Sequence, residues 1–526
     1  MAVSITGYGG VGEIGGNKFL LEDGASRFLL DFGTAFGRRQ RYFNELLRPR
    51  VARGLLDLLA LDLIPPLEGL YRDDLAYPGL WERFRSGKLY RNLRRGECRP
   101  AVDGVFISHA HLDHNGDLSF LDPAVTVYST RASAFIARAM QVTGVSSFDR
   151  ELMYANPRAL SKTGELQADR SASYQVRPCR FLDGALSPEA AQFWRTSPGS
   201  RKEMICGTTQ ACDGACAGLL LRFFPVDHSV PGAAAIAVQT SAGWIAYTGD
   251  IRFHGGDGAL TRRFAEELAK LRPRALLCEG THLGAGPVVS ETEVGERAIA
   301  ITASAAGRLA IADFGPRNLE RLRSFLDVAE ATGRTLVAAP KDIYMLEALS
   351  LADPDRFPSP FALPHLGVYA DPKASLKPWE GELRQRWQSR TVGPADVSAR
   401  PGDYILCFSL WDANDLLDLV GVAGGAYLYS NSRAYEEEQA IDLQRLRHWV
   451  GHMGLSFHGD PDDPRASPLH ASGHAPGPDL LRLVLDVRPR TLIPIHTEDA
   501  GWWHERLSGS GIEVLEPEVG VPLVLG

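Results

Sequence analysis

The stretch VFISHAHLDH, residues 105–114, carries the strongest signal in this sequence. An apolar run typical of a β-strand leads directly into the pattern H-x-H-x-D-H. Side chains alternate along an extended strand, so His109 and His111 should project to the same side. A helix that begins just afterwards would turn Asp113 and His114 toward a neighbouring point. The pattern therefore predicts a metal centre with donors for two ions.

Further ligands should follow downstream, because zinc-like ions need three or four nitrogen or oxygen ligands each. His228 follows the apolar run FFPV, Asp250 ends WIAYTGD, and His496 ends TLIPIH. Ligands at strand ends sit on rigid backbone while the adjacent loops stay open to substrate. We therefore expect these residues to complete the shells of two divalent metal ions, with zinc as the first choice and manganese as the alternative.

The first forty residues predict three β-strands, at 3–10, 17–22 and 26–33, separated by glycine and aspartate. This arrangement favours an antiparallel sheet. The glycine-rich stretch 7–12 superficially resembles a dinucleotide-binding loop. Such a loop needs a helix next, whereas residues 17–31 look like a hairpin, so no nicotinamide cofactor is expected.

From about residue 273 onward, strands alternate with amphipathic helices. The segments are RALLCEG, GERAIAITASAAG, RLAIADF, NLERLRSFLDVAEATG and RTLVAAP. This βαβ rhythm implies parallel strands. It ends near the polar helical run AYEEEQAIDLQRLRHWVGHMG, after which short strands and histidine-containing loops return. We therefore expect a separate α/β module in this region.

Composition sets broad limits on the class of protein. The chain has 526 residues, 44% of them hydrophobic, which is enough for two or three compact domains. The N-terminus lacks a secretory signal and the apolar runs are interrupted by charges, so we expect a cytoplasmic protein without a membrane. The seven cysteines fit a reducing compartment. Cys179, Cys206, Cys212 and Cys216 could hold a structural metal, although they contain no C-x-x-C pair.

The net charge of −8 argues against indiscriminate binding of nucleic acid. Phosphate contacts need locally clustered Lys and Arg, and such clusters occur at 38–53 and 83–99. Arg38, Arg39 and Arg41 are the candidate phosphate contacts of the first cluster. The alternative is that these arginines form a solvated helical surface.

In the order of its motifs the chain resembles the metallo-β-lactamase superfamily. LLDFG with Asp31 is followed by H-x-H-x-D-H, and then by His228 and Asp250. The resemblance implies that Asp31 supports the ligands from behind. It also implies that His109, His111 and His228 hold one metal ion, that Asp113, His114 and His496 hold the other, and that Asp250 bridges the two.

Three further motifs resemble the β-CASP nucleases, and ribonuclease J in particular: Glu279 in LLCEGTHLG, His474 in HASGHA and His496 in IPIHTE. The resemblance covers most of the chain. It implies an α/β fold, a metallo-β-lactamase αββα sandwich with an inserted β-CASP domain. The expected sandwich comprises residues 1–285, with longer segments at about 34–100 and 140–220, and residues 451–526. The expected insertion is 286–450. The oligomeric state is open, with a homodimer as one option.

The expected chemistry is hydrolysis of a phosphodiester by a hydroxide that two metal ions activate. Asp113 would orient or deprotonate the attacking water, and Glu279 would fix a ligand imidazole. His474 has no metal assigned to it, so it is the candidate for protonating the leaving oxygen or stabilising the oxyanion. The same loop offers three candidates for binding a substrate phosphate: His470, Ser472 and Gly473.

Single-stranded RNA is the expected substrate and partner, because within the β-CASP family a histidine at the last motif accompanies RNA-acting members. Whether such an enzyme acts as a 5′-exonuclease, an endonuclease or both stays open. One alternative is a DNA nuclease of the same family, which the arginine-rich segments permit equally well. Another is a small-molecule ester or lactone hydrolase, since bare metallo-β-lactamase domains do such work. Nucleic acid is expected to enter between the sandwich and the 286–450 domain.

Overall fold

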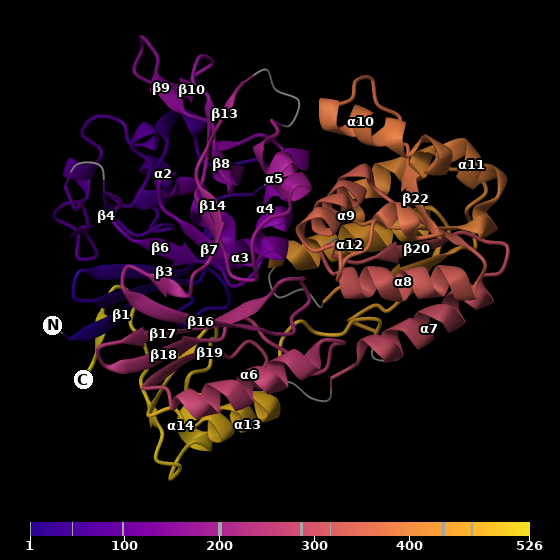
Figure 1. Ribbon diagram of the computed structural model, residues 1–526. Coiled ribbons are helices and arrows are strands. Elements are labelled where there is room, and N and C mark those ends of the chain that lie inside the picture. The colour runs from indigo at the N-terminus through magenta and orange to yellow at the C-terminus, as the bar shows by residue number, and fades with distance from the viewer. Residues whose placement is uncertain are drawn as a thin grey trace.

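The computed structural model describes residues 2–44, 46–96, 99–197, 202–284, 288–315, 317–432, 437–463 and 466–526. Figure 1 shows a core built from the N-terminal and C-terminal parts of the chain, beside a module built from its middle. Both are of mixed α/β type. Within the described ranges, no helix is long and apolar enough to cross a membrane.

The eight-stranded core sheet begins with three antiparallel strands, β1 (Val3–Gly9), β2 (Lys18–Asp23) and β3 (Ser26–Phe32). The antiparallel arrangement expected for the N-terminus is confirmed, and β2 follows the glycine loop directly. β29 (Pro522–Leu525) pairs with β1. Beyond β3 the strands run parallel, in the order β6 (Gly104–Phe106), β7 (Val127–Ser129), β12 (Cys179–Phe181) and β14 (Thr209–Ala211).

A seven-stranded sheet faces the first one. Phe19 and Phe28 from the first sheet share an apolar core with Ile236 and Val238 from the second. In sheet order the strands are β15 (Ala215–Cys216), β16 (Leu219–Pro225), β17 (Ala234–Thr240), β18 (Gly243–Tyr247), β19 (Ala275–Glu279), β27 (Thr491–Ile495) and β28 (Glu513–Val514). β19 runs parallel to β27. This pairing brings the end of the Glu279 motif beside the end of the His496 motif.

Helices cover the second sheet on its outer face. α6 (Gly258–Leu271), α13 (Gly477–Val487) and α14 (Gly501–Arg506) contribute apolar side chains to one cluster with the strands β19 and β27. These helices lie together at one end of the core (Figure 1). They form the layer behind the second sheet.

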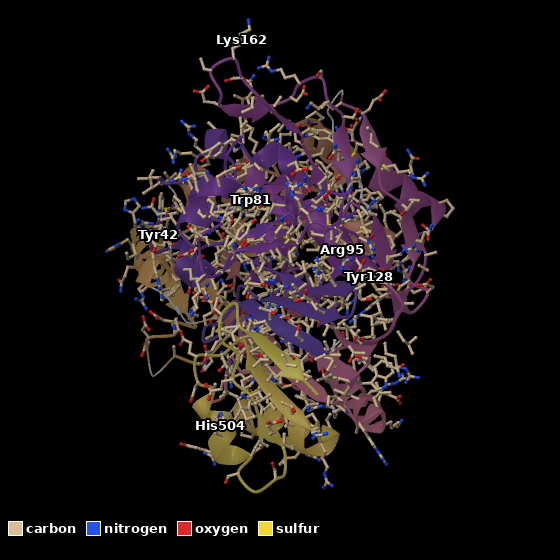
Figure 2. All side chains as sticks on the ribbon, turned by 90° about the vertical axis from the view of Figure 1, so that its left-hand side faces the viewer. Tyr42, Trp81, Arg95, Tyr128, Lys162 and His504 are labelled. Carbon is tan, nitrogen blue, oxygen red and sulfur yellow. The ribbon has the colours of Figure 1, made fainter. Side chains whose placement is uncertain are left out.

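The segments expected to be long, 34–100 and 140–220, lie around the first sheet, and 140–220 also contributes its strands β12 and β14. They contribute α1 (Phe36–Arg39), α2 (Leu56–Ala60), α5 (Pro188–Arg195) and short strands: β4 (Leu67–Glu68), β5 (Arg91–Asn92), β8 (Tyr154–Ala155), β9 (Arg158–Leu160), β10 (Leu166–Ala168), β11 (Tyr174–Val176) and β13 (Met204–Cys206). Figure 2 shows Lys162, in the turn between β9 and β10, at the opposite end of the molecule from His504 on α14.

The module has a seven-stranded parallel sheet, in agreement with the βαβ prediction. Its strands are β20 (Ala310–Asp313), β21 (Thr335–Ala338), β22 (Leu366–Tyr369), β23 (Thr391–Val392), β24 (Tyr404–Leu406), β25 (Ala426–Tyr429) and β26 (Ser456–His458). Its helices are α7 (Glu291–Ser304), α8 (Leu319–Ala331), α9 (Pro340–Ala352), α10 (Pro378–Arg386), α11 (Pro394–Ala399) and α12 (Glu437–His452).

Two details differ from the sequence-based expectation for this module. The strand RALLCEG, which opened the expected βαβ series, is β19 and belongs to the core sheet, because its hydrogen-bonding neighbours are β18 and β27. The last module strand, β26, pairs with β25 and lies past the expected boundary at residue 450. A strand's sheet depends on its distant partners, which local periodicity does not reveal.

Core and module meet along an apolar interface. α4 (Arg131–Thr143), which covers the first sheet, packs against α9 of the module, and the two lie side by side in Figure 1. A single cluster of buried side chains includes Phe135 and Ile136 from α4 together with Ile343 and Leu349 from α9. A shared apolar interface of this kind favours a fixed relative position of the two lobes.

Candidate metal centre

The H-x-H-x-D-H pattern lies at the end of β6, where an extended stretch passes into the short helix α3 (Leu112–Asn115). His109 Nε2 lies 3.1 Å from His111 Nδ1. His111 has extended backbone and directly precedes the helix, which carries Asp113 and His114. The change from strand to helix brings the four side chains of the motif to one place, as the spacing predicts.

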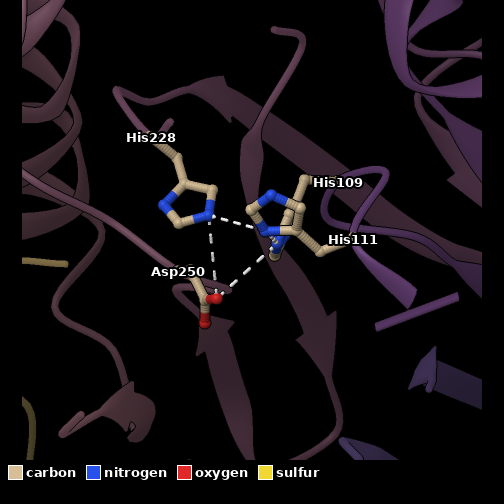
Figure 3. Close-up of side chains that lie close together, drawn as sticks. All are labelled: His109, His111, His228 and Asp250. Carbon is tan, nitrogen blue, oxygen red and sulfur yellow. Dashed lines mark hydrogen bonds and ion pairs between the residues drawn. The ribbon is translucent and has the colours of Figure 1, made fainter. Parts of the chain in front are cut away.

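The first cluster consists of His109, His111, His228 and Asp250, which point toward one another in Figure 3. His228 Nε2 lies 3.1 Å from His111 Nδ1. Asp250 Oδ2 lies 3.6 Å from His109 Nε2 and 3.9 Å from His228 Nε2. One ligand atom from each residue fits within 4.8 Å of all the others, which is the spacing that a single cation requires.

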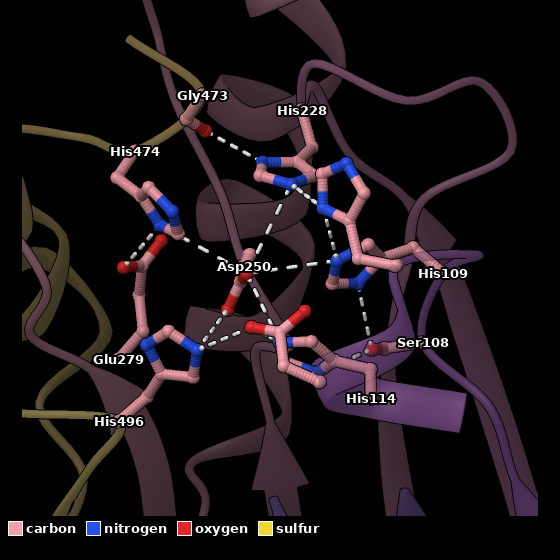
Figure 4. A network of polar contacts seen from close by, with 12 residues as sticks. Ser108, His109, His114, His228, Asp250, Glu279, Gly473, His474 and His496 are labelled. Carbon is pink, nitrogen blue, oxygen red and sulfur yellow. Dashed lines mark hydrogen bonds and ion pairs between the residues drawn. The ribbon is translucent and has the colours of Figure 1, made fainter. Parts of the chain in front are cut away.

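The second cluster consists of Asp113, His114, Asp250 and His496, and it shares Asp250 with the first (Figure 4). His496 Nε2 lies 3.3 Å from Asp113 Oδ2 and 3.8 Å from Asp250 Oδ1. The remaining member, His114, places its Nε2 3.0 Å from Asp250 Oδ2. Asp250 therefore stands between two sets of nitrogen and oxygen donors.

Two buried atoms of this site lack a hydrogen-bond partner among the described residues: His114 Nε2 and Asp250 Oδ1. His114 Nε2 is close to Asp250 but outside hydrogen-bonding geometry. A buried polar atom without a partner is costly, so such atoms usually bind something else. Because both atoms point into the cluster, the donor set fits a cation.

Burial favours the neutral imidazoles that metal ions bind. Desolvation lowers the pKa of His228 to about 4 and lowers the pKa values of His109 and His111 well below the usual range. Burial alone would raise the pKa of Asp250, but His114 and His496 hold it well below its ordinary value. The first cluster thus combines neutral imidazoles with an ionised carboxylate.

Asp31 contacts His114 on the side of its ring away from Asp250. Its Oδ2 lies 2.7 Å from His114 Nδ1 and accepts hydrogen bonds from Ser108 Oγ at 2.7 Å and Tyr247 OH at 2.6 Å. Its Oδ1 accepts from the Ser108 N–H at 2.7 Å. Asp31 has a φ of 56°, which is uncommon outside glycine and often marks a functional site. Sequence reasoning did not find Ser108 or Tyr247.

Glu279 supports two imidazoles, one directly and one through Thr281. Its Oε2 lies 3.0 Å from His474 Nδ1 and accepts from Thr281 Oγ1 at 2.8 Å. Thr281 Oγ1 in turn lies 2.8 Å from His496 Nδ1. Despite burial, Glu279 and Asp250 raise the pKa of His474 to about 9. Sequence reasoning missed Thr281, whose role depends on the pairing of β19 with β27.

The polar groups of the HASGHA loop form hydrogen bonds mainly within the loop and with His228. His228 Nδ1 donates to the carbonyl of Gly473 at 2.6 Å. Ser472 Oγ accepts from the His474 N–H at 3.0 Å. His470 lies 3.5 Å from the carbonyl of Ser430, and burial lowers the pKa of His470 to about 4. The Gly473 contact positions His228, and the expected role of His470, Ser472 and Gly473 in phosphate binding stays a prediction.

Two of the three arginines expected to contact phosphate form ion pairs within the protein. Arg38 pairs with Glu13 at 2.8 Å, and Arg39 pairs with Asp149 at 2.6 Å. Arg41 is exposed. The paired arginines are therefore less available than the sequence alone suggested.

The cysteines do not form a metal site in the described parts of the chain. Cys179 and Cys216 are buried, and burial raises the pKa of each thiol to about 12. The described groups of three or more metal-ligating residues contain only histidine, aspartate and glutamate. The alternative of a structural metal held by these cysteines is thus not supported.

A family model matches the C-terminal part of the chain. It is described as a Zn-dependent metallo-hydrolase RNA specificity domain and covers residues 465–517. This stretch contains the HASGHA loop and His496. Together with the His and Asp clusters, the match indicates that the chain binds divalent metal.

Proteins named ribonuclease J are similar over larger parts of the chain. The protein from Mycobacterium tuberculosis is 29% identical over 301 residues, which are 52% of this chain and 46% of that protein. The protein from Sinorhizobium meliloti is 24% identical over 409 residues, 77% of this chain and 59% of that protein. Ribonuclease J 2 from Streptococcus pyogenes is 23% identical over 349 residues, 65% and 46% of the two chains. The chain thus spans about half the length of these relatives.

A protein of unknown function from Enterococcus faecalis V583 has a similar crystal structure. The TM-score is 0.66 and the sequence identity is 21%, with 100% of both chains covered. At this identity the likeness concerns the fold alone.

Proposed function

We propose that this chain, a ribonuclease J-like metal-dependent hydrolase, hydrolyses phosphodiester bonds of single-stranded RNA as a 5′-exonuclease, an endonuclease or both. The observation that carries the proposal is the pair of ligand clusters that share Asp250. Two adjacent cation sites are the arrangement that clamps the attacking and leaving oxygens of a phosphodiester. The names of the relatives and the description of the matched domain support RNA as the substrate.

The fold we assign is a metallo-β-lactamase αββα sandwich with an inserted β-CASP domain. Two facing sheets with helices outside them support the sandwich, which we assign to residues 1–285 and 451–526. The parallel sheet of the module supports the insertion at 286–450, continued through β26. The candidate metal centre lies where strand ends of the core meet the HASGHA loop.

Two divalent ions are proposed for the centre. His109, His111 and His228 would hold one, and Asp113, His114 and His496 would hold the other, with Asp250 between them. Imidazole and carboxylate ligands suit zinc and also manganese. When bound, such ions neutralise phosphate charge and lower the pKa of a water molecule.

The chain's own groups complete the reaction. The Asp113 side chain is 26% exposed, more than the other carboxylates of the centre, so it can orient the attacking water and accept its proton. His474 Nδ1 forms a hydrogen bond with Glu279, so its Nε2 is available to protonate the leaving oxygen. Arg41, exposed on the arginine-rich segment, remains a candidate for a phosphate contact.

The test is incubation of the metal-loaded protein with single-stranded RNA and DNA of one sequence, each with a 5′-phosphate or a 5′-hydroxyl, and sizing of the products on a gel. We expect RNA to be cleaved faster than DNA. Mononucleotide products would indicate exonuclease action, and internal fragments endonuclease action. Faster cleavage of DNA would favour the DNA nuclease alternative. Hydrolysis of an aryl ester or a lactone, with no cleavage of either nucleic acid, would favour the small-molecule hydrolase.

A further inference from the structure

Arg317 is a module residue that reaches the metal ligands of the core. It lies in the loop between β20 and α8, directly before Asn318, whose side chain caps α8. Its Nη1 donates to the carbonyl of Ala110 at 3.3 Å. Ala110 stands between His109 and His111 in the sequence. The Arg317 guanidinium therefore lies against the H-x-H motif.

The charge of Arg317 acts electrostatically on the neighbouring side chains of the proposed metal centre. Burial lowers the pKa of Arg317, and the Asp113 carboxylate opposes this shift. Burial and His228 lower the pKa of His111, and Arg317 adds to this effect. The hydrogen bond to the Ala110 carbonyl holds the guanidinium beside the cluster, where its charge acts at short range. A substrate phosphate at the metal centre would lie in the same field.

Arg317 has unused hydrogen-bonding capacity. No carboxylate lies within ion-pair distance of it in the parts of the chain that the structure describes, and its other contact is with Met140 Sδ at 3.9 Å. A guanidinium offers five N–H donors, and a half-buried one without an anion is unfavourable. Its planar fork matches two oxygens of a phosphate. The side chain is thus set up for an anionic ligand.

We propose that Arg317 forms a phosphate subsite that holds the nucleic-acid strand beside the bond at the metal centre. The inference rests on the proposed nuclease function and deepens it. It assigns this contact with the backbone to a residue of the module. Arg38 and Arg39, which pair with acids, do not belong to this subsite.

The test compares Arg317→Met and Arg317→Lys with a control, Arg482→Met, whose side chain on α13 is 84% exposed. Bound metal is measured first, and then kcat and KM on a single-stranded oligoribonucleotide at several salt concentrations. Arg317→Met should keep its metal and lose about 10- to 100-fold in kcat/KM, the usual loss for a charge-assisted hydrogen bond. The slope of log KM against log salt should flatten by about 0.7 when Arg317 is removed. Arg317→Lys should recover part of the loss, and Arg482→Met should match the wild type.

Three results would overturn the subsite. If Arg317→Met keeps the wild-type kcat/KM and salt slope, Arg317 does not bind the strand, while the nuclease function stands. If Arg317→Met loses metal and excess metal restores the wild-type kcat/KM, Arg317 merely supports the H-x-H segment. If the wild type cleaves no phosphodiester at all, the proposed function fails and the subsite fails with it.

Discussion

His474 and His496 are neighbours with different partners. Their ring centroids are 5.7 Å apart. His496 Nε2 contacts Asp113, and its Nδ1 contacts the hydroxyl of Thr281. His474 Nδ1, in contrast, hydrogen-bonds to Glu279. His474 also forms a possible ligand group with Asp250 and Glu279. We therefore expect different consequences when each of the two histidines is replaced.

His474→Ala should keep the metal content and slow turnover by about 10²–10⁴-fold, the range for losing a positioned acid or oxyanion donor. His496→Ala removes a proposed ligand, so metal content and rate should fall together, and excess manganese should restore part of the rate by mass action. Bound metal and single-turnover cleavage are measured on both variants. Loss of metal from His474→Ala, or cleavage at the wild-type rate, would contradict the assignment of His474 as the acid.

The contacts of Thr281 predict a role in metal affinity that the sequence alone does not indicate. Thr281→Val removes the hydroxyl that links Glu279 to His496, so metal affinity should fall by about 10- to 100-fold while the rate at saturating metal stays near that of the wild type. The matched control is Thr302→Val on α7, because the buried Thr302 hydroxyl has no hydrogen-bond partner among the described residues. Metal titration is the measurement. Equal affinities in the two variants would mean that the Thr281 hydroxyl does not orient the ligand.

At the scale of elements, the HASGHA loop is held against the His228 strand end at Gly473. A Cβ at this position would lie 2.7 Å from Ser229 Oγ and 2.9 Å from His228 Cε1. The loop can approach His228 this closely only because residue 473 has no side chain. Glycine at position 473 thus allows the loop to pack against His228.

Gly473→Ala should push the loop away from His228, break the hydrogen bond to the Gly473 carbonyl and weaken metal binding in the first cluster. Gly295→Ala is the control, since nothing lies within 4 Å of its added Cβ and alanine favours a helix by about 1 kcal/mol. Isothermal titration with zinc measures the effect. Wild-type zinc affinity in Gly473→Ala would show that the loop tolerates displacement.

The elements also show which parts of the site a sequence can predict. That His109, His111, Asp113 and His114 lie close together follows from spacing alone, because they sit on one strand-to-helix turn. Ser108 reaches Asp31, and Thr281 reaches His496, only through pairing of strands distant in sequence, and local pattern carries no trace of that pairing. For the same reason the local βαβ pattern grouped RALLCEG with the module, whereas the boundary at 285 that the resemblance implied left it in the core. Arg317 escaped notice because it comes from the module and reaches the site only when the two lobes pack together.

At the scale of the whole molecule, the shared apolar interface predicts that core and module unfold together. Leu349 is fully buried on α9, in the cluster that includes α4. Leu349→Ala should cost about 2–5 kcal/mol of unfolding free energy and lower the melting temperature of the whole chain in one transition. Leu417→Ala, at a module side chain that is 58% exposed, should change little. Two separate calorimetric transitions, with the core transition unchanged, would show that the lobes are independent.

The central claim is that the clusters sharing Asp250 hold the metal ions that make this chain a nuclease. The most direct test is cleavage of 5′-labelled single-stranded RNA by the wild type and by His111→Ala, each assayed after chelator treatment and again after addition of zinc or manganese, with bound metal measured in parallel. The wild type should lose both metal and cleavage with chelator and regain both with added metal, while His111→Ala should bind less metal and stay inactive. Full cleavage by the metal-stripped wild type in the presence of chelator would contradict the account.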